Sequence, residues 1–395
     1  MTNSFKNIQI KTSFTNIDDP NHLTKIKPNL EDFQNPYKVF HHLDRVESLK
    51  KTGDSFPLHL TIGLTNHCNH KCSWCYINWN QAGSLAKRSG ASNLNTKKAI
   101  NADFKIIEAV KQAVNMGLKA VTIVGDGEPT LHPKFSEYLD ELGFMKIDIG
   151  IFTNLSTRNE SILDSMIKNC FFIRCSIDAA SSEVHAIQHG TNDFEQIIEN
   201  LKRIISCKKD NKPIIGVQYV VNEKNIHELE EAVLFYKKIG VDYITIKPAY
   251  KNLLNIAHES NKLNLDDALL VLKKVKQYQD NNYKVYSKES QFIESLSFET
   301  NSARYYKKCY ATPLSPYLDE DGSLEMCGNL KGRGFNIGNI NDSTFKELWE
   351  SERRQECMSS IDLFKCPSGC KLDPINKVLW DAFNPEKNIL HPNFV

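Results

Sequence analysis

The chain has 395 residues, of which 41% are hydrophobic and 25% are charged, a composition that excludes global disorder. Its length allows one large domain and a smaller one. The 49 Lys and Arg residues almost balance the 48 Asp and Glu residues, so the net charge gives no reason to expect a nucleic-acid or membrane-surface partner.

No apolar run approaches the roughly 20 residues that a membrane-spanning helix needs. The N-terminal segment also lacks the apolar core of a signal peptide. These features predict a cytoplasmic protein. Because the cytoplasm keeps thiols reduced, we expect clusters among the 11 cysteines to be metal or iron–sulfur ligands rather than disulfides.

The predicted elements begin with an N-terminal capping segment over residues 1–57, in which a helix is expected from about Pro36 to Lys51. Short apolar or β-branched runs of strand length follow, with helical segments between them, two of which end in glycine signals at Gly117 and Gly240. The predicted strands cover residues 58–64, 120–125, 147–152, 171–177, 214–221 and 242–247.

This alternation predicts parallel strands with right-handed crossovers, and six units are too few to close an eight-stranded barrel. We therefore expect an α/β fold, a partial (β/α)6 TIM-like barrel over residues 58–290, with ligands at the carboxyl ends of the strands. Residues 291–395 are predicted to form a small C-terminal α+β domain. It opens with a hairpin that turns at Asp321 and Gly322 and continues into a glycine-rich loop and a helix.

The first cysteine group follows the first predicted strand. Cys68, Cys72 and Cys75 have the spacing C-x3-C-x2-C, and Trp74 precedes the third cysteine. Three thiolates on one loop can hold three corners of a [4Fe–4S] cluster and leave one iron open to a ligand such as S-adenosylmethionine (SAM). The tryptophan can shield the cluster and flank the adenine.

Two other sites fit these cysteines. A zinc ion would take His67 or His70 as its fourth ligand. A cluster used only for electron transfer would want a fourth cysteine nearby, and the sequence has none there.

The cysteine spacing, the aromatic residue and the position after the first strand resemble the radical SAM superfamily. GDGEPTLHP at 125–133 resembles the family's GGEP motif, with Asp126 in place of a glycine. FTNLST and SIDAASS also resemble polar strand ends of the family. The resemblance implies SAM-binding roles for Trp74, Gly125, Asp126, Gly127, Glu128, Thr153, Asn154, Ser176, Asp178, Val221 and Lys247.

Some of these positions have a plainer interpretation. Val221 and Lys247 equally fit core or rim residues. Many relatives have Arg-Gly where this chain has His189 and Gly190, so His189 is interpreted as a loop residue.

The second cysteine group lies in the C-terminal region. Cys309 and Cys327 flank the predicted hairpin, and Cys366 and Cys370 follow on a later loop. They resemble the SPASM extension or its shorter twitch form, and imply one auxiliary [4Fe–4S] cluster because full SPASM domains use more cysteines for two. The final C-x3-C departs from the common C-x2-C, and a structural zinc remains the alternative.

The other cysteines are Cys170, Cys175 and Cys207, which packing explains, and Cys357. In radical SAM epimerases a free thiol returns a hydrogen atom to the substrate radical. Cys357 is the candidate for that role here, with an inert helix residue or a cluster ligand as alternatives.

The resemblance implies an enzyme that takes an electron from a donor such as flavodoxin or ferredoxin and cleaves SAM to a 5′-deoxyadenosyl radical. The radical would abstract a hydrogen from a small-molecule substrate in the barrel. We expect dehydrogenation of a sugar- or aminocyclitol-like molecule, because the 57 residues before the first strand are poor in the strand signals of a peptide leader-binding domain. The alternatives are epimerisation of a sugar or peptide, maturation of a ribosomally made peptide, and a zinc-bound scaffold protein.

Overall fold

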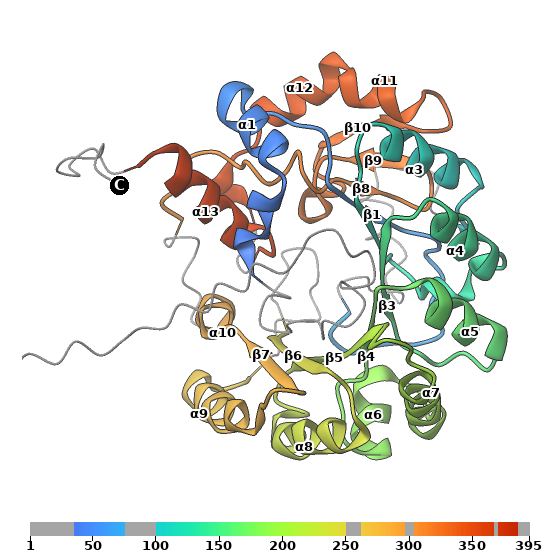
Figure 1. Cartoon of the computed structure of the whole chain (residues 1–395). Coiled ribbons are helices and arrows are strands. Elements are labelled where there is room, and N and C mark those ends of the chain that lie inside the picture. Colours follow the sequence, from blue (N-terminus) through green and yellow to red (C-terminus); the bar gives the residue numbers. More distant parts are fainter. Residues whose placement is uncertain (1–34, 76–99, 250–261, 297–303, 367–369, 386–395) are drawn as a thin grey trace, which may run out of the picture.

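The computed structural model describes residues 35–75, 100–249, 262–296, 304–366 and 370–385. Its strands form one ten-stranded sheet in the order β10-β9-β8-β1-β2-β3-β4-β5-β6-β7, which curves around a central lumen (Figure 1). Seven of them are the parallel strands β1 (His59–Ile62), β2 (Ala120–Ile123), β3 (Asp148–Thr153), β4 (Phe172–Ser176), β5 (Ile214–Val221), β6 (Tyr243–Pro248) and β7 (Lys284–Ser287).

The expected α/β fold with a parallel, open-barrel sheet is confirmed, and all six predicted strands are present. The seventh parallel strand, β7, is not among them. It has only four residues, KVYS, and one of them is fully buried. A segment this short and this polar carries no clear strand signal.

The sheet does not end where the barrel units end. A hairpin of β8 (Tyr317–Leu318) and β9 (Ser323–Glu325) turns at Asp321 and Gly322 as predicted, with Gly322 at a φ of +86°. β8 pairs in parallel with β1, and β10 (Asn336–Asn339), within the predicted glycine-rich loop, pairs antiparallel with β9. The C-terminal region is therefore part of the barrel's sheet.

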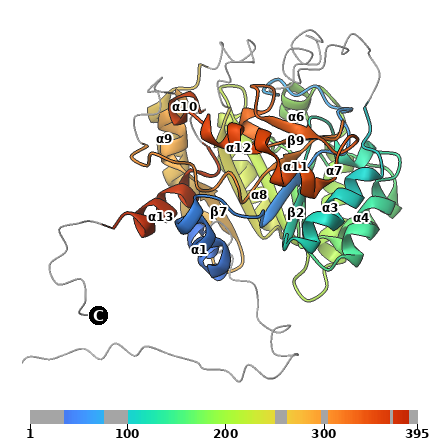
Figure 2. The ribbon, with the colours of Figure 1, turned by 90° about the horizontal axis from the view of Figure 1, so that it is seen from above.

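Helices cover the outer face of the sheet (Figures 1 and 2). The α-helices of the barrel are α3 (Lys105–Asn115), α4 (Phe135–Phe144), α5 (Glu160–Asn169), α6 (Ser182–His189), α7 (Phe194–Ser206), α8 (Leu229–Ile239), α9 (Leu265–Val275) and α10 (Glu289–Leu296). The C-terminal region adds α11 (Phe345–Glu350), α12 (Glu352–Ser359) and α13 (Asp373–Phe383).

One hydrophobic core lies between the sheet and these helices. It takes alternate strand residues, such as Ile173 and Cys175 of β4 and Ile244 and Ile246 of β6. Because side chains alternate along a strand, the intervening residues point into the lumen. The sheet therefore presents a second, more polar set of side chains to any ligand inside the barrel.

The predicted N-terminal helix is confirmed as two pieces, the 3₁₀ helix η2 (Pro36–His41) and α1 (Leu43–Thr52). Val39 and Leu49 pack against Leu314 and Leu379, so α1 lies beside α13 (Figures 1 and 2). Within the described residues, no helix combines the length and the apolar character that crossing a membrane requires.

Candidate active site

The cysteine loop follows β1 at the carboxyl edge of the sheet. Cys68, Cys72 and Cys75 are half-buried there and act on one another electrostatically. Burial raises the pKa of Cys68 to about 12, helped by the nearby Glu128, and burial also raises the pKa of Cys72. Such thiols become thiolates only when a cation compensates them, which is the role of bound iron or zinc.

A zinc site requires a particular spacing of its sulfur ligands. Four sulfurs around zinc, at about 2.3 Å each, lie roughly 3.8 Å apart. In the part of the chain that the structure describes, neither cysteine group brings three sulfurs within 4.8 Å of one another. Within the described residues, the cysteines therefore do not form a preformed zinc site of three sulfurs.

A cluster of buried histidines packs against the cysteine loop. His189 is the last residue of α6, and its Nδ1 lies 3.3 Å from Cys72 Sγ and 3.1 Å from His70 Nδ1. Its Nε2 lies 3.0 Å from Asp178 Oδ2, in a pair whose side chains are at most 1% exposed. The interpretation of His189 as a loop residue is wrong, because a single-sequence pattern does not show that a helix ends against the cysteine loop.

The same cluster fixes the other histidines. His70 Nε2 and His185 Nε2 lie 2.9 and 3.0 Å from the two oxygens of Asp193. Together with His189 and Cys72, His70 offers three ligand atoms within 4.8 Å. A zinc ion here would therefore use one cysteine and two histidines, not the three cysteines and one histidine that the sequence suggested.

The loop after β2 packs directly on the cysteine loop. A Cβ at Gly127 would lie 2.1 Å from the carbonyl oxygen of His67, so only glycine fits there. The Gly127 and Glu128 amides donate to the carbonyl oxygens of Thr65 and His67, at 3.0 and 2.8 Å. Gly125 makes a similar approach to the start of the cysteine loop. This contact sets the position of the two loops relative to each other.

The Glu128 carboxylate accepts hydrogen bonds from neighbouring parts of the barrel. This buried carboxylate accepts from Thr153 Oγ1 at 2.6 Å and from the Asn154 amide at 2.7 Å, joining the ends of β2 and β3. The Asn154 side chain donates to Asn69 in the cysteine loop at 2.9 Å. SAM contacts for these residues stay predictions, and contacts by the Glu128 carboxylate would compete with the bonds just described.

The remaining predicted SAM contacts are spread along the sheet edge. Ser176 is half-buried at the end of β4, whereas Asp178 holds His189 and accepts from the Val220 amide. Val221 lies in the main core, so only its main chain can meet a ligand. Lys247 points into the lumen from β6, and Trp74 makes an edge contact with His189 at 6.2 Å.

The four C-terminal cysteines also converge. Cys327, Cys366 and Cys370 share a small apolar cluster, and Cys309 acts electrostatically on all three. Burial raises the pKa of Cys327 to about 12 and that of Cys366 to about 11. Such a set of cysteines needs a bound metal or cluster to exist as thiolates.

Two asparagine side chains donate hydrogen bonds to these sulfur atoms. Asn376 Nδ2 donates to Cys309 Sγ and Asn329 Nδ2 donates to Cys370 Sγ, both at 3.3 Å. Donors to sulfur are a common feature of iron–sulfur ligation, because they stabilise thiolate charge. The sequence did not reveal either asparagine as a partner of a cysteine.

Lys331 connects the barrel to the C-terminal region, and its contact with Asp126 accounts for an acid at that position of the glycine-rich motif. Its ammonium lies 2.8 Å from Asp126 Oδ2 and 2.5 Å from Asp319 Oδ2, and all three side chains are at most 9% exposed. Burial opposes the charge of Lys331, but Asp126 and Asp319 raise its pKa above the ordinary value. Asp126 therefore ties the loop after β2 to the β8–β9 hairpin.

Cys357 lies apart from both sites. It is buried in α12, and its thiol faces the carbonyl oxygens of Gly334 and Asn336 at 3.8 Å. Its electrostatic neighbours are Arg353, Glu325 and Glu356 rather than the predicted cluster ligands. Its role as a hydrogen donor stays a prediction.

Cys170 and Cys175 are buried, in agreement with the prediction that packing explains them. Cys207 is exposed at the end of α7, so packing does not explain that cysteine.

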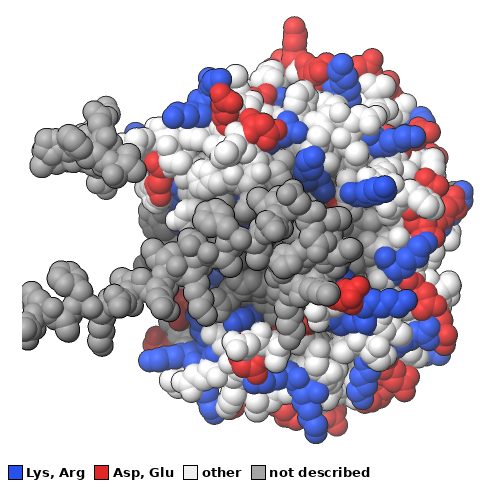
Figure 3. Space-filling view, viewed as in Figure 1, with Lys and Arg blue, Asp and Glu red and all other residues white. Residues whose placement is uncertain are grey.

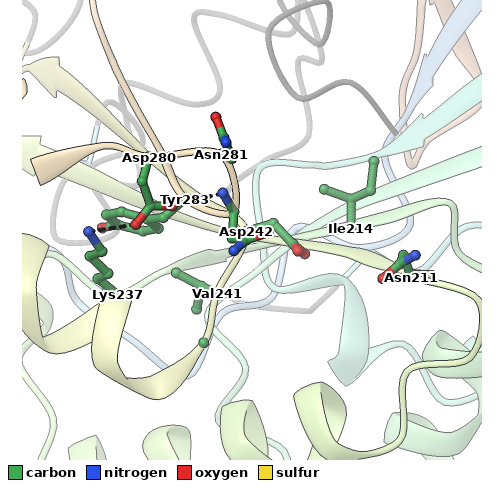
Figure 4. Close-up of a pocket in the computed structure, with 10 residues that line it drawn as sticks. Asn211, Ile214, Lys237, Val241, Asp242, Asp280, Asn281 and Tyr283 are labelled. Carbon is green, nitrogen blue, oxygen red and sulfur yellow. Dashed lines mark hydrogen bonds and ion pairs between the residues drawn. The ribbon is translucent and has the colours of Figure 1, made fainter. Parts of the chain in front are cut away.

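Figure 3 shows Lys and Arg interspersed with Asp and Glu on the face that it presents. Two cavities lie at different ends of the strands. One, of about 280 Å³, lies at the amino ends of β5, β6 and β7, opposite the predicted ligands (Figure 4). There Lys237 pairs with Asp280 and Asp242 pairs with Lys208, so its charges are balanced. The other lies inside the barrel, beside Lys247.

Comparison with known proteins matches the chain to the radical SAM superfamily over residues 62–236 and to the iron–sulfur cluster-binding domain SPASM over residues 309–372. The chain resembles SuiB of Streptococcus suis bound to S-adenosylmethionine, with a TM-score of 0.62, 20% identity, and coverage of 86% of this chain and 81% of that one.

Two curated proteins are also similar. One is the tungsten-containing aldehyde ferredoxin oxidoreductase cofactor-modifying protein of Pyrococcus furiosus, which is 21% identical over 75% of this chain and 81% of that protein. The other is the antilisterial bacteriocin subtilosin biosynthesis protein AlbA of Bacillus subtilis, which is 23% identical over 81% of this chain and 68% of that protein.

Proposed function

We propose that this chain, which belongs to the radical SAM superfamily and carries a C-terminal SPASM iron–sulfur domain, oxidises a small polar, carbohydrate-like substrate inside its barrel. Its cofactors are SAM, the SAM-binding [4Fe–4S] cluster and auxiliary iron–sulfur chemistry in the SPASM domain. When bound, these groups supply a 5′-deoxyadenosyl radical and a nearby electron acceptor.

The residues present fit these groups. Cys68, Cys72 and Cys75 would hold the first cluster, and the four C-terminal cysteines would hold the second. The observation that carries the proposal is their rigid connection, because β8 pairs with β1 and Lys331 bridges Asp126 to Asp319. An oxidation that removes a hydrogen atom and then an electron needs both sites at fixed positions around one substrate.

The chain's own residues have definable tasks in this reaction. Gly127 lets the loop after β2 approach the cysteine loop, and Glu128 and Thr153 hold that loop against β3. Polar inward-facing positions of β4 and β6 orient the substrate, and the surrounding sheet excludes water from it. The oxidation also releases one proton from the substrate to the solvent.

The first test is anaerobic reconstitution, iron and sulfide counting, and an assay for 5′-deoxyadenosine with dithionite and SAM. Two [4Fe–4S] clusters give about eight irons per chain. Cys72→Ala should abolish SAM cleavage. Cys327→Ala should lower the iron content to about four and keep SAM cleavage, because it leaves the first cluster's ligands intact.

Cys207→Ala, at an exposed helix end, is the matched control and should behave as the unchanged protein. Iron without deoxyadenosine in the unchanged protein would refute the proposed reaction.

A peptide substrate is the second candidate. It is favoured by the similar structure of SuiB bound to the precursor peptide SuiA, with a TM-score of 0.61. Deoxyadenosine release should be measured with a panel of sugar acids, sugar phosphates and aminocyclitols, and separately with short peptides. Stimulation by the first panel alone supports the small-molecule proposal, and stimulation by peptides alone replaces it.

A further inference from the structure

The cavity inside the barrel, of about 280 Å³, carries an unusual charge. Five cationic residues line it, namely Lys38 of η2, Arg174 of β4, Lys247 of β6, Lys288 after β7 and Lys371 before α13. Among the described residues, none that lines it is Asp or Glu. The five cations come from distant parts of the chain and meet in one cavity because the sheet is curved.

Three of these lysines lack an ion-pair partner within the described part of the chain. Among the described residues, no carboxylate forms an ion pair with Lys247, Lys288 or Lys371, whereas the buried Lys331 contacts two carboxylates. Arg174 donates from Nε to the hydroxyl of Tyr243 at 3.0 Å, which is a neutral acceptor.

The nearest acid does not change this balance. Asp373 acts electrostatically on Lys288, but it accepts from the Tyr306 hydroxyl at 2.7 Å and pairs with Lys377 at 2.9 Å. Arg304 also lies 3.6 Å from it. Asp373 is therefore already compensated by other groups.

Structural contacts account for Arg174 and Lys371. Arg174 lies over the rings of Phe152, Phe172 and Tyr243, at 4.7, 5.8 and 5.4 Å from their centroids. Lys371 lies near Cys327 and Cys370, so the charge of the auxiliary site balances it. Among the described residues, the charged groups that act on Lys247 are the cations Arg174, Lys371 and Lys288. Burial together with these cations lowers the pKa of Lys247 to about 7, so its charge is held at a cost that a bound anion would remove.

We propose that this cavity binds a carboxylate or phosphate group of a small substrate, with Lys247 and Lys288 as its main contacts. The inference rests on the proposed function, because it treats the lumen as the substrate site. The cavity of about 280 Å³ has room for a small anionic group. An ammonium also binds either anion well, so the chemistry common to both is a charged oxygen acceptor.

The test is calorimetric titration of the reconstituted holoenzyme, at low ionic strength, with inorganic phosphate and separately with succinate. Lys247→Gln and Lys288→Gln should each weaken binding by about tenfold or more, because each removes one charge-assisted hydrogen bond. Lys273→Gln, on the exposed face of α9, is the matched control and should bind as the unchanged protein does. Preference for phosphate or for succinate identifies which anion the substrate carries.

The proposal is overturned if neither anion binds the unchanged protein, or if both lysine variants bind as tightly as the control. Iron content and the unfolding midpoint of each variant, measured in the same preparations, identify a variant that has lost its fold. Deoxyadenosine formation by the unchanged protein separates the two hypotheses. Lysine-dependent anion binding without SAM cleavage supports the anion site and refutes the proposed reaction. SAM cleavage without lysine-dependent anion binding supports the reaction and refutes the anion site.

Discussion

Removing the positive charge of Lys331 should strongly destabilise the protein. Lys331 is the shared cation of Asp126 and Asp319, and the neighbouring Glu320 has a pKa well above its ordinary value because it is buried beside Asp319. The burial of Glu320 disfavours its charged form, and Asp126 and Asp319 both contact the ammonium of Lys331. In Lys331→Met the buried carboxylates of Asp126 and Asp319 lose the ammonium that both contact.

The expected loss of stability follows from the removal of this shared cation. Breaking a buried ion pair by removing one partner costs about 3–5 kcal/mol, because the remaining charge stays desolvated. Lys331→Met should lie in this range, and Asp126→Gly should cost less, because Lys331 keeps Asp319. The double variant should be more stable than the sum of the two losses predicts, by about 1–3 kcal/mol, since it removes one unpaired carboxylate.

The assay is urea unfolding of the reconstituted full chain, followed by circular dichroism and by cluster absorbance. Lys346→Met, on the exposed face of α11, is the control and should change stability by less than about 0.5 kcal/mol. A cost below about 1 kcal/mol for Lys331→Met would refute the reasoning. So would strictly additive effects in the double variant, because they would mean that Asp126 and Lys331 are not coupled.

Three further outcomes are expected. His189→Gln removes the ring nitrogen 3.3 Å from Cys72 Sγ, and a bond of about 0.5–1.5 kcal/mol corresponds to a shift of roughly 20–65 mV toward a more negative cluster potential. A redox titration followed by electron paramagnetic resonance measures it, with exposed His67→Gln as the control expected to show no shift. The unfolded chain holds the Lys247 proton up to about pH 10.5 and the folded chain releases it near 7, so stability should rise with pH across that window. Lys247→Met should flatten that rise in urea unfolding between pH 7.5 and 9, and an unchanged slope would contradict the assignment. Cys357→Ala should cost about 1–2 kcal/mol and leave product formation intact, because the thiol is buried in α12. Normal deoxyadenosine release with loss of product would instead identify Cys357 as the hydrogen donor.

The sequence was most informative where one local signal decides the outcome. The apolar runs of β1 to β6 are each buried on the helix-covered face, so composition alone locates them. The spacing of Cys68, Cys72 and Cys75 is likewise local, because all three ligands come from one loop. β7 escaped detection since its four residues take their place from pairing with β6 rather than from their own pattern.

The rest of the site depends on contacts between distant segments. Asp126 stands out as a substitution in a glycine-rich motif, but its partner Lys331 follows it by 205 residues. His189 meets Cys72 across 117 residues, and the cationic cavity assembles side chains from β4, β6, β7 and α13. No pattern within a window of ordinary length contains such pairs. A signal did exist, since an acid in place of a glycine at a buried turn requires a cation somewhere.

The parallel pairing of β8 with β1 also bears on how the chain is made. His59 Nδ1 lies 2.9 Å from Ser315 Oγ, a residue 256 positions later, so β1 gains its outer neighbour only after the intervening barrel units have been made. During translation β1 is an edge strand, with hydrogen-bonding groups open to other chains. Pairing over so long a separation is slow. The cysteine loop is thus made long before β8 can pair with β1, and we expect productive cluster insertion to follow that pairing.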